Sequence, residues 1–299
     1  MDLERHRGIR LQGNQTISVN FSSWDSQQHI FVLFLCMYLV TMVGNLLIIL
    51  TIVNDANLHS PMYFFLANLS FTDICFTSTT VPKMLADIQN QSPVISFAGC
   101  LTQMYFFMLL VDLDNFLLAA MVYAICHPLC YAALLSLKRC ALLVVTPWVV
   151  CNLVSGLHLG LLGLLNFCDQ REIPHFFCDL EPILRLACSD TQINDLTILV
   201  IGGSAIFIPF TFICVSYCLI GCTVLRIPSA KGKWKTFSTC GSHLLAVSLF
   251  YGSISGVYFL PSSAYSAEKD KVAAVMYTMV TPMMNPFIYS LRNKDMKEL

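Results

Sequence analysis

Long apolar stretches, separated by short polar ones, make up most of the chain. Five of them contain no Asp, Glu, Lys or Arg, and each has at least 20 residues. About 20 apolar residues are enough for a helix to cross the ~30 Å hydrocarbon layer of a bilayer. The pattern therefore predicts five membrane-spanning helices, over residues 26–54, 140–168, 196–225, 236–267 and 272–291.

Two further apolar segments carry acidic residues inside the span. Residues 61–86 contain Asp73, and residues 98–124 contain Asp112 and Asp114. An ionisable side chain within a membrane helix is costly and marks a candidate functional site. With both segments included, the chain crosses the membrane seven times, so its two termini lie on opposite sides.

The apolar segments are continuous and lack the alternation over about ten residues that marks the strands of an outer-membrane barrel. We therefore predict an all-α membrane protein, a seven-transmembrane helix bundle. The bundle is expected over residues 28–291, with an extracellular tail over 1–27 and a cytoplasmic segment over 292–299.

Composition supports a membrane protein and argues against other classes. Of the 299 residues, 56% are hydrophobic and only 12% are charged, whereas a soluble domain carries about 25% charged residues. The 17 basic and 18 acidic residues nearly balance, so we expect no nucleic-acid partner. This composition predicts that membrane lipid surrounds the protein.

The distribution of charge indicates which side faces the cytoplasm. With the amino terminus outside, the predicted inner segments carry nine basic and three acidic residues, as the positive-inside rule requires. Arg5, Arg7 and Arg10 precede the first helix and argue the other way. The inner segments in this topology are 54–60, 125–139, 226–235 and 292–299.

The amino-terminal tail has features of an extracellular segment. The first 25 residues lack the apolar core of a secretory signal peptide, so we expect the first helix to act as an uncleaved anchor. Sequons at Asn14 and Asn20 lie in this tail, and glycosylation there fits an external position.

Four of the 14 cysteines lie on the predicted outer side, where an oxidising environment favours disulfides. Cys100 opens the third helix, and Cys168, Cys178 and Cys188 follow at steps of ten residues in the long outer loop. Four cysteines allow three sets of pairs, and the residues alone leave all three open. A bridge between the third helix and the loop would hold the loop over the mouth of the bundle.

Six short motifs occur in order along the chain, near the ends of the predicted helices. They are GNLLI (44–48), PMYFFLANLSFTDICF (61–76), MVYAICHPLCY (121–131), Ser216-Tyr217, KTFSTCGSHL (235–244) and PMMNPFIYSLRNKDMK (282–297). Together they resemble the olfactory receptors of the rhodopsin-like G-protein-coupled class, over about residues 30–297.

The resemblance implies a receptor that binds small volatile odorants and activates a stimulatory, heterotrimeric G protein. It implies a multi-pass protein of the plasma membrane, in the cilia of olfactory neurons. It also implies a disulfide between Cys100 and Cys178, which leaves Cys168 to pair with Cys188. A bond between Cys100 and Cys188 is the alternative.

The chain departs from the family pattern in two places. Residues 1–25 differ from the family's short amino terminus. The family's Met-Ala-Tyr-Asp-Arg-Tyr-Val-Ala-Ile-Cys is also shortened, so that Tyr123 is followed directly by Ala124. Four missing residues shorten a helix by ~6 Å and rotate the rest of that helix by about 40°, which we expect the fold to tolerate. The missing arginine meets the G protein in the family and is not replaced before Lys138, so a receptor-like product with impaired coupling is an alternative.

Asp73 and Asp114 lie at similar depth, about half a bilayer from the ends of their helices. Two close carboxylates repel each other unless one is protonated or a cation lies between them. Hard cations take oxygen ligands, which Asn45 and Asn285 would complete. The resemblance identifies this set as the sodium pocket of the class, and no other cofactor is expected. The alternatives are a protonated carboxyl group hydrogen-bonded to asparagine and a carboxyl group that faces lipid.

An odorant site needs a mostly apolar cavity with a few polar groups that orient the ligand. The outer-half positions that bind ligands in the family carry no basic side chain here, which favours a neutral alcohol, ketone, ester or aldehyde over a carboxylate. Ordinary packing between helices is the alternative for each position. The candidates are Phe107, Met108, Val111, Ile201, Ala205, Tyr251, Ile254, Ser255, Tyr258, Tyr277 and Thr278.

The resemblance also implies a group of residues that respond to activation. A proline inside a span offers a bending point, and a histidine near the inner end of the sixth helix belongs to the family's inner lock. A lone membrane histidine otherwise only hydrogen-bonds a neighbour. The implied group is Tyr217, His243, Asn285, Pro286 and Tyr289.

Two other classes fit the sequence less well. A transporter is expected to show inverted repeats with broken helices in matching halves. An intramembrane enzyme is expected to carry an assembled catalytic motif. We find neither in the sequence, so we predict a receptor that is not an enzyme.

Overall fold

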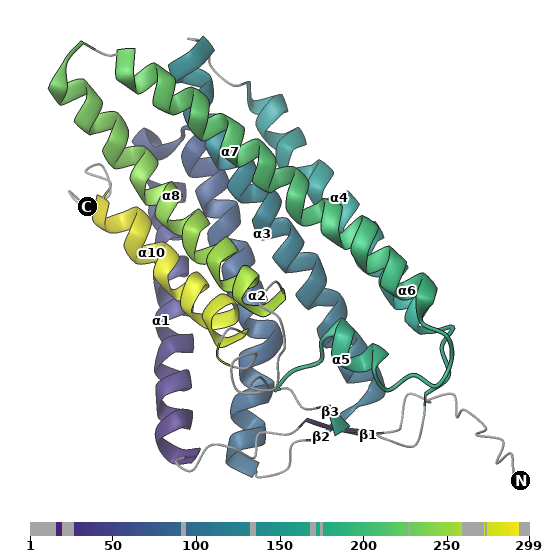
Figure 1. Ribbon diagram of the computed structural model, residues 1–299. Helices are drawn as coiled ribbons and strands as arrows, with labels where there is room; N and C mark the ends of the chain where they lie inside the picture. The colour runs from purple at the N-terminus through teal and green to yellow at the C-terminus, as the bar shows by residue number, and fades with distance from the viewer. Residues whose placement is uncertain are drawn as a thin grey trace, which may run out of the picture.

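The computed structural model describes residues 16–19, 27–90, 94–131, 136–167, 172–173, 176–226, 228–258, 272 and 274–292. Within these ranges, seven long helical segments form an elongated bundle (Figure 1). This confirms the predicted seven-helix membrane bundle. The segments are α1 (Gln27–Asn54), α2 (Pro61–Asn90), α3 (Phe97–Tyr131), α4 (Leu137–Leu162), the continuous α6 (Gln192–Thr197), η2 (Ile198–Gly202) and α7 (Gly203–Arg226), then α8 (Ala230–Tyr258), and finally η3 (Met276–Val280) with α10 (Thr281–Arg292).

Length and apolar composition explain why these segments are helices. In the described residues, α1, α3, α4 and the continuous α6–η2–α7 are long and apolar enough to cross a membrane by those two criteria alone. The 30 residues of α2 include Asp73, Lys83 and Asp87, so this helix is more polar. A helix satisfies its backbone hydrogen bonds internally, which the lipid interior demands.

α3 is the central helix of the bundle. In its most apolar stretch 78% of the residues are buried, against 22% in α1 and α4 and 11% in α6–η2–α7. The outer helices instead expose large apolar side chains such as Leu153, Leu199 and Ile208. Such a surface is stable against lipid rather than water. α3 therefore supplies many of the buried positions from which an internal site can be built.

Three short strands form a sheet among the described residues, at the end of the bundle away from the α7–α8 connection (Figure 1). β1 (Thr16–Val19) lies between β2 (Val94–Ser96) and β3 (Glu172–Ile173), antiparallel to β2 and parallel to β3. The expectation of a purely helical chain missed this sheet, because strands this short depend on partners far away in the sequence. β1 ties part of the amino-terminal tail to two outer loops.

α1 and α10 approach each other closely at Gly44. A Cβ atom at this position would lie 3.0 Å from Cβ and Cγ of Pro286, so a larger residue would require Pro286 to shift, and glycine allows the close approach of the two helices. The next residue, Asn45, donates a hydrogen bond from Nδ2 to the carbonyl of Pro282 at 3.1 Å. The GNLLI motif therefore docks the first helix against the last one.

Candidate functional site

A small cavity lies in the middle of the bundle, between α2, α3, α8, η3 and α10. About 10 Å³ of it is open to the centre of a water molecule, which is room for one water or one small ion. It is lined by Leu69, Asp73, Phe76, Asp114, Leu118, Ala246, Phe250, Tyr277, Thr281, Pro282 and Asn285. Both acidic residues predicted for the sodium site and one of the two asparagines thus meet here.

The polar wall of this cavity is incompletely hydrogen-bonded. Asn285 donates from Nδ2 to Oδ2 of Asp73 at 2.9 Å, which joins α10 to α2. The Oδ1 atoms of Asp114 and Asn285 are buried and have no hydrogen-bond partner among the described residues. Because a buried acceptor without a partner is costly, this geometry favours a water molecule, a proton or a cation between them.

The residues present fit a small hard cation. Two carboxylates and an amide carbonyl supply oxygen ligands, the kind that such cations take. The described residues contain no group of three or more His, Cys, Asp or Glu side chains that could hold a metal ion. Asn45, the fourth predicted ligand, does not line the cavity. Its Nδ2 instead donates to the carbonyls of Thr41 and Pro282, at 3.0 and 3.1 Å.

Three aromatic rings surround Phe107 of α3 on the outer side of the cavity. The ring centroid of Phe107 lies 4.7 Å from that of Phe177, 5.3 Å from that of Phe76 and 5.9 Å from that of Tyr277. These four residues, here called the aromatic cluster, come from α2, α3, the outer loop and η3. Phe76 and Tyr277 also line the cavity, so the aromatic cluster and the cavity adjoin.

The other predicted ligand-binding residues take different positions. Ser255 is exposed, although it follows the buried Tyr251 by four residues, a spacing that places both on one face of a helix. The side chain of Tyr258 lies outside the described residues. Thr278 is buried and donates its hydroxyl proton to the carbonyl of Ala274 at 2.7 Å. Of the rest, Tyr251, Ile254 and Tyr277 are buried, and Met108, Val111, Ile201 and Ala205 are partly buried.

Asn115 joins three helices next to the predicted ligand site. Tyr251 of α8 donates its hydroxyl proton to Oδ1 of Asn115, and Nδ2 of Asn115 donates to the carbonyl of Ala205 in α7 at 2.7 Å. Asn115 is not among the residues predicted from the sequence. The available signal was a polar side chain beside Asp114 within an apolar span.

His243 forms a second network, in the inner half of the bundle. Its Nε2 lies 2.9 Å from the carbonyl oxygen of Leu118 in α3, and its Nδ1 lies 2.7 Å from the hydroxyl of Tyr217 in α7. A carbonyl only accepts, so Nε2 carries the proton, and in a neutral imidazole Nδ1 accepts from Tyr217. Two residues of the predicted activation group therefore connect α3, α7 and α8.

The other members of that group lie on α10. Pro286 is buried against Gly44, and Asn285 reaches Asp73 as described above. Tyr289 is buried, and its hydroxyl has no hydrogen-bond partner among the described residues. The group is thus divided between the cavity and the inner network, and Tyr289 joins neither by a hydrogen bond within the described chain.

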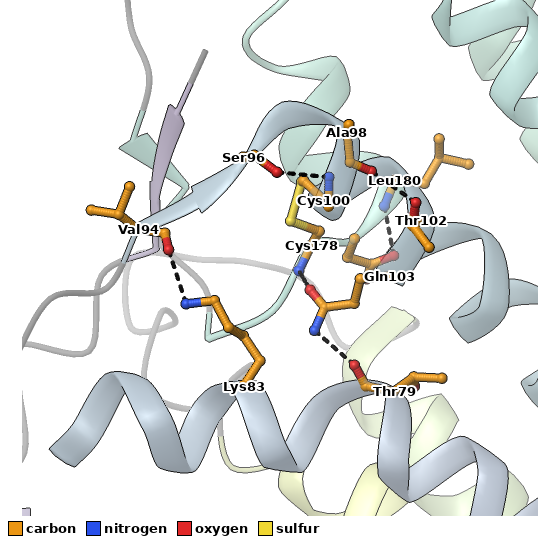
Figure 2. The surroundings of a disulfide bond; sticks show 12 residues. Thr79, Lys83, Val94, Ser96, Ala98, Cys100, Thr102, Gln103, Cys178 and Leu180 are labelled. Atoms are coloured by element: carbon orange, nitrogen blue, oxygen red, sulfur yellow. Dashed lines mark hydrogen bonds between the residues drawn. A yellow bond between two sulfur atoms is a disulfide. The ribbon is translucent and has the colours of Figure 1, made fainter. Parts of the chain in front are cut away.

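A disulfide joins Cys100 at the start of α3 to Cys178 in the outer loop (Figure 2). This is the pairing that the family resemblance implies, and it replaces the alternative of Cys100 with Cys188. Cys188 is also disulfide-bonded, whereas Cys168 lies outside the described residues. Asn14 and Asn20, the predicted glycosylation sites, lie outside them as well.

The helical arrangement is that of a rhodopsin-like seven-helix receptor. The chain superposes on the crystal structure of squid rhodopsin with a TM-score of 0.71, covering 91% of this chain and 79% of that one. Sequence identity in this comparison is 17%, so the similarity concerns the fold alone.

Sequence comparisons then define the family. A family model described as "Olfactory receptor" matches residues 34–299. Olfactory receptor 1F1 of Homo sapiens is 56% identical over 289 residues, which cover 95% of this chain and 93% of that protein. Olfactory receptor 1f45 of Rattus norvegicus is 58% identical over 277 residues, covering 91% and 88%. The chain belongs to the olfactory receptor family of G-protein-coupled, multi-pass membrane proteins.

Proposed function

We propose that this receptor binds small, mostly neutral volatile molecules in the outer half of the bundle, with Phe107 at the centre of the site. The observation that carries the proposal is the aromatic cluster, where rings from four segments meet at centroid distances of 4.7 to 5.9 Å from Phe107. Aromatic side chains bind an apolar ligand by shape and dispersion. Because none of the candidate lining residues carries a charge, a carboxylate ligand would lose its hydration without compensation.

Ligand orientation would depend on hydroxyl groups that are already hydrogen-bonded. The hydroxyl of Tyr251 is bonded to Asn115, and that of Thr278 is bonded to its own helix. A polar group on the ligand must compete with these bonds, so a single good acceptor or donor would decide the orientation. Exposed Ser255 is a weaker candidate for this role.

Dose-response curves for alcohols, ketones, esters, aldehydes and carboxylates test the proposal. Phe107→Leu is expected to weaken the responses to neutral ligands at least about tenfold, since the aromatic ring at the centre of the proposed site and part of its buried area are lost. Ser255→Ala and Tyr258→Phe test whether these two hydroxyl groups contribute to the orientation of the ligand. A response restricted to carboxylates, or unaltered by Phe107→Leu, would contradict the proposed site.

We also propose that a sodium ion binds in the central cavity. Asp73, Asp114 and the carbonyl of Asn285 would hold it, and its charge would balance two carboxylates that otherwise repel each other. In this state α2, α3 and α10 are tied together through one site. Protonation of one carboxyl group is the competing description, and it predicts no dependence of stability on sodium.

Coupling to a stimulatory olfactory G protein is the expected output, and a second candidate is a receptor with impaired coupling. α3 runs unbroken from Phe97 to Tyr131 across the shortened junction after Tyr123, which supports a folded receptor despite the loss. The Asp-Arg-Tyr-Val segment of the family is nevertheless absent, and with it the arginine that meets the G protein. This absence favours weak signalling from a folded receptor.

One comparison separates these two candidates. Surface expression and cAMP are measured for this chain and for a version with Asp-Arg-Tyr-Val restored after Tyr123. We expect similar surface amounts and a much larger cAMP response from the restored version. Equal responses would show that the shortened junction does not limit coupling.

We propose a plasma-membrane location, in olfactory cilia, with the amino terminus outside the cell and glycans at Asn14 and Asn20. Support comes from the charge asymmetry across the membrane and from the two sequons. Epitope tags in the tail and in residues 226–235, read on intact and permeabilised cells, test the orientation. Deglycosylation combined with Asn14→Gln and Asn20→Gln tests the glycans.

A further inference from the structure

The outer loop is attached to the bundle at two points of one residue. The sulfur atom of Cys178 is bonded to Cys100 of α3, and the backbone N–H of Cys178 donates to Oε1 of Gln103 at 3.0 Å (Figure 2). Cys100 and Gln103 are three residues apart and therefore lie on the same face of α3. A single tether allows rotation about its own bonds, whereas two tethers on one residue fix its orientation as well.

The second half of the Gln103 amide reaches another helix. Its Nε2 donates to the carbonyl of Thr79 in α2 at 2.9 Å (Figure 2). One partner only donates and the other only accepts, so reversing the amide would lose both bonds, and its orientation is unambiguous. Gln103 is buried, and it holds the loop, α3 and α2 at one fixed separation.

The residue adjacent to this double attachment is Phe177, a member of the aromatic cluster. Its ring centroid lies 4.7 Å from that of Phe107 and 5.1 Å from that of Phe176, and its side chain is buried. The loop therefore inserts a large ring into the proposed ligand site from the outside. Any rotation of the backbone at Cys178 would move this ring relative to α3.

We infer that Gln103 is a positioning residue that sets the depth and orientation of Phe177 in the aromatic cluster, and so determines which ligand shapes the receptor accepts. The inference rests on the ligand site proposed above, since it assigns Gln103 a role in the specificity of that site. Gln103 acts on the ligand through Phe177 and does not contact the ligand itself. The disulfide brings the loop to the bundle, and Gln103 fixes its orientation there.

Gln103→Met tests the inference because it keeps the length of the side chain and removes both hydrogen bonds. Thr102→Val is the matched control, since Thr102 is the exposed neighbour whose hydroxyl donates to the carbonyl of Ala98 in its own helix. Binding is measured as the shift in Tm of the purified receptor, which does not depend on G-protein coupling. The ligands are pairs of neutral ketones and esters with the same functional group, one slim and one bulky.

We expect Gln103→Met to change the ratio of Kd values for slim and bulky ligands by about tenfold, and Thr102→Val to leave it unchanged. In a Phe177→Ala background, Gln103→Met is expected to have no further effect on this ratio, because its target is gone. A ratio unaltered by Gln103→Met would overturn the inference. The inference would also be overturned if Gln103→Met changed this ratio equally with and without the Phe177 ring.

Hydrogen exchange of the ligand-free receptor separates this inference from the proposed function. Exchange over residues 176–180 should be faster in Gln103→Met than in the wild type or in Thr102→Val. If the wild type binds none of the ligands, the proposed function fails, and this exchange measurement alone decides the positioning role. Equal exchange in all three proteins would then overturn it.

Discussion

The aromatic cluster and the central cavity are neighbours that are built from different interactions. In the cluster, Phe107 contacts three rings, and apolar contacts of this kind are non-directional. In the cavity, Asp73 and Asn285 share a directional hydrogen bond, and Asp114 offers an oxygen with no partner in the described chain. The first arrangement adapts to many shapes, whereas the second responds to charge.

The two regions share part of their walls. Phe76 and Tyr277 contact Phe107 on the outer side and line the cavity on the inner side. A ligand that moves either ring would therefore alter the surroundings of the buried carboxylates. This contact is a physical connection between ligand and cavity, and measured coupling must establish whether the receptor uses it.

The largest expected effect follows the loss of the disulfide between Cys100 and Cys178. Cys100→Ser removes a disulfide between residues 78 positions apart, which should lower the free energy of unfolding by ~4 kcal/mol. Thermal melts of the purified receptor measure this loss. The control is Cys214→Ser, which replaces an exposed free cysteine. If the aromatic cluster and the central cavity act independently, Cys100→Ser loses ligand binding but keeps any response to sodium.

A smaller effect is expected where α1 meets α10. Gly44→Ala places a Cβ 3.0 Å from Pro286, and overpacking of this kind costs about 1–3 kcal/mol. Gly156→Ala is the control, since its Cβ would meet nothing within 4 Å and it gains helix propensity. Equal melting temperatures for the two variants would show that α10 shifts freely and that the walls of the cavity are not rigid.

Sodium dependence distinguishes the two regions most selectively. Raising sodium at constant ionic strength should stabilise the wild type by about 1.4 kcal/mol at ten times the Kd. Asp114→Asn should abolish this effect, and the exposed Glu181→Gln should preserve it. A wild type that does not respond to sodium would favour the protonated carboxyl group instead.

The smallest predicted change tests the link between α3, α7 and α8. Tyr251→Phe leaves Oδ1 of Asn115 buried without its donor, which costs about 1 kcal/mol. A double-mutant cycle with Asn115→Ala should give a coupling energy of similar size. Strict additivity of the two substitutions would show that this hydrogen bond does not link the helices.

Much of the fold could be predicted because the bilayer imposes it. Charge-free stretches of at least 20 residues have few alternatives to spanning helices, and the acids at Asp73 and Asp114 are conspicuous within them. Gln103 and Asn115 could not be identified in this way, because their partners are backbone atoms of other segments. β1 was missed for the same reason.

Helical spacing also has a limit that Ser255 illustrates. It shows which side chains share a face, but the neighbouring helices decide which part of that face is covered. Tyr251 and Ile254 are buried, while Ser255, one residue further, is exposed. The sequence therefore predicted the ligand-facing side of α8 only approximately.

The central claim is that the aromatic cluster binds the neutral ligand and the central cavity binds sodium. Its most direct test is the melting temperature of the purified receptor with sodium and with a neutral ligand, each added separately. Phe107→Leu should reduce the ligand-induced shift and keep the sodium-induced one, and Asp114→Asn should abolish the sodium-induced shift and keep the ligand-induced one. This division would be contradicted if Phe107→Leu abolished the sodium response, or if Asp114→Asn abolished ligand binding.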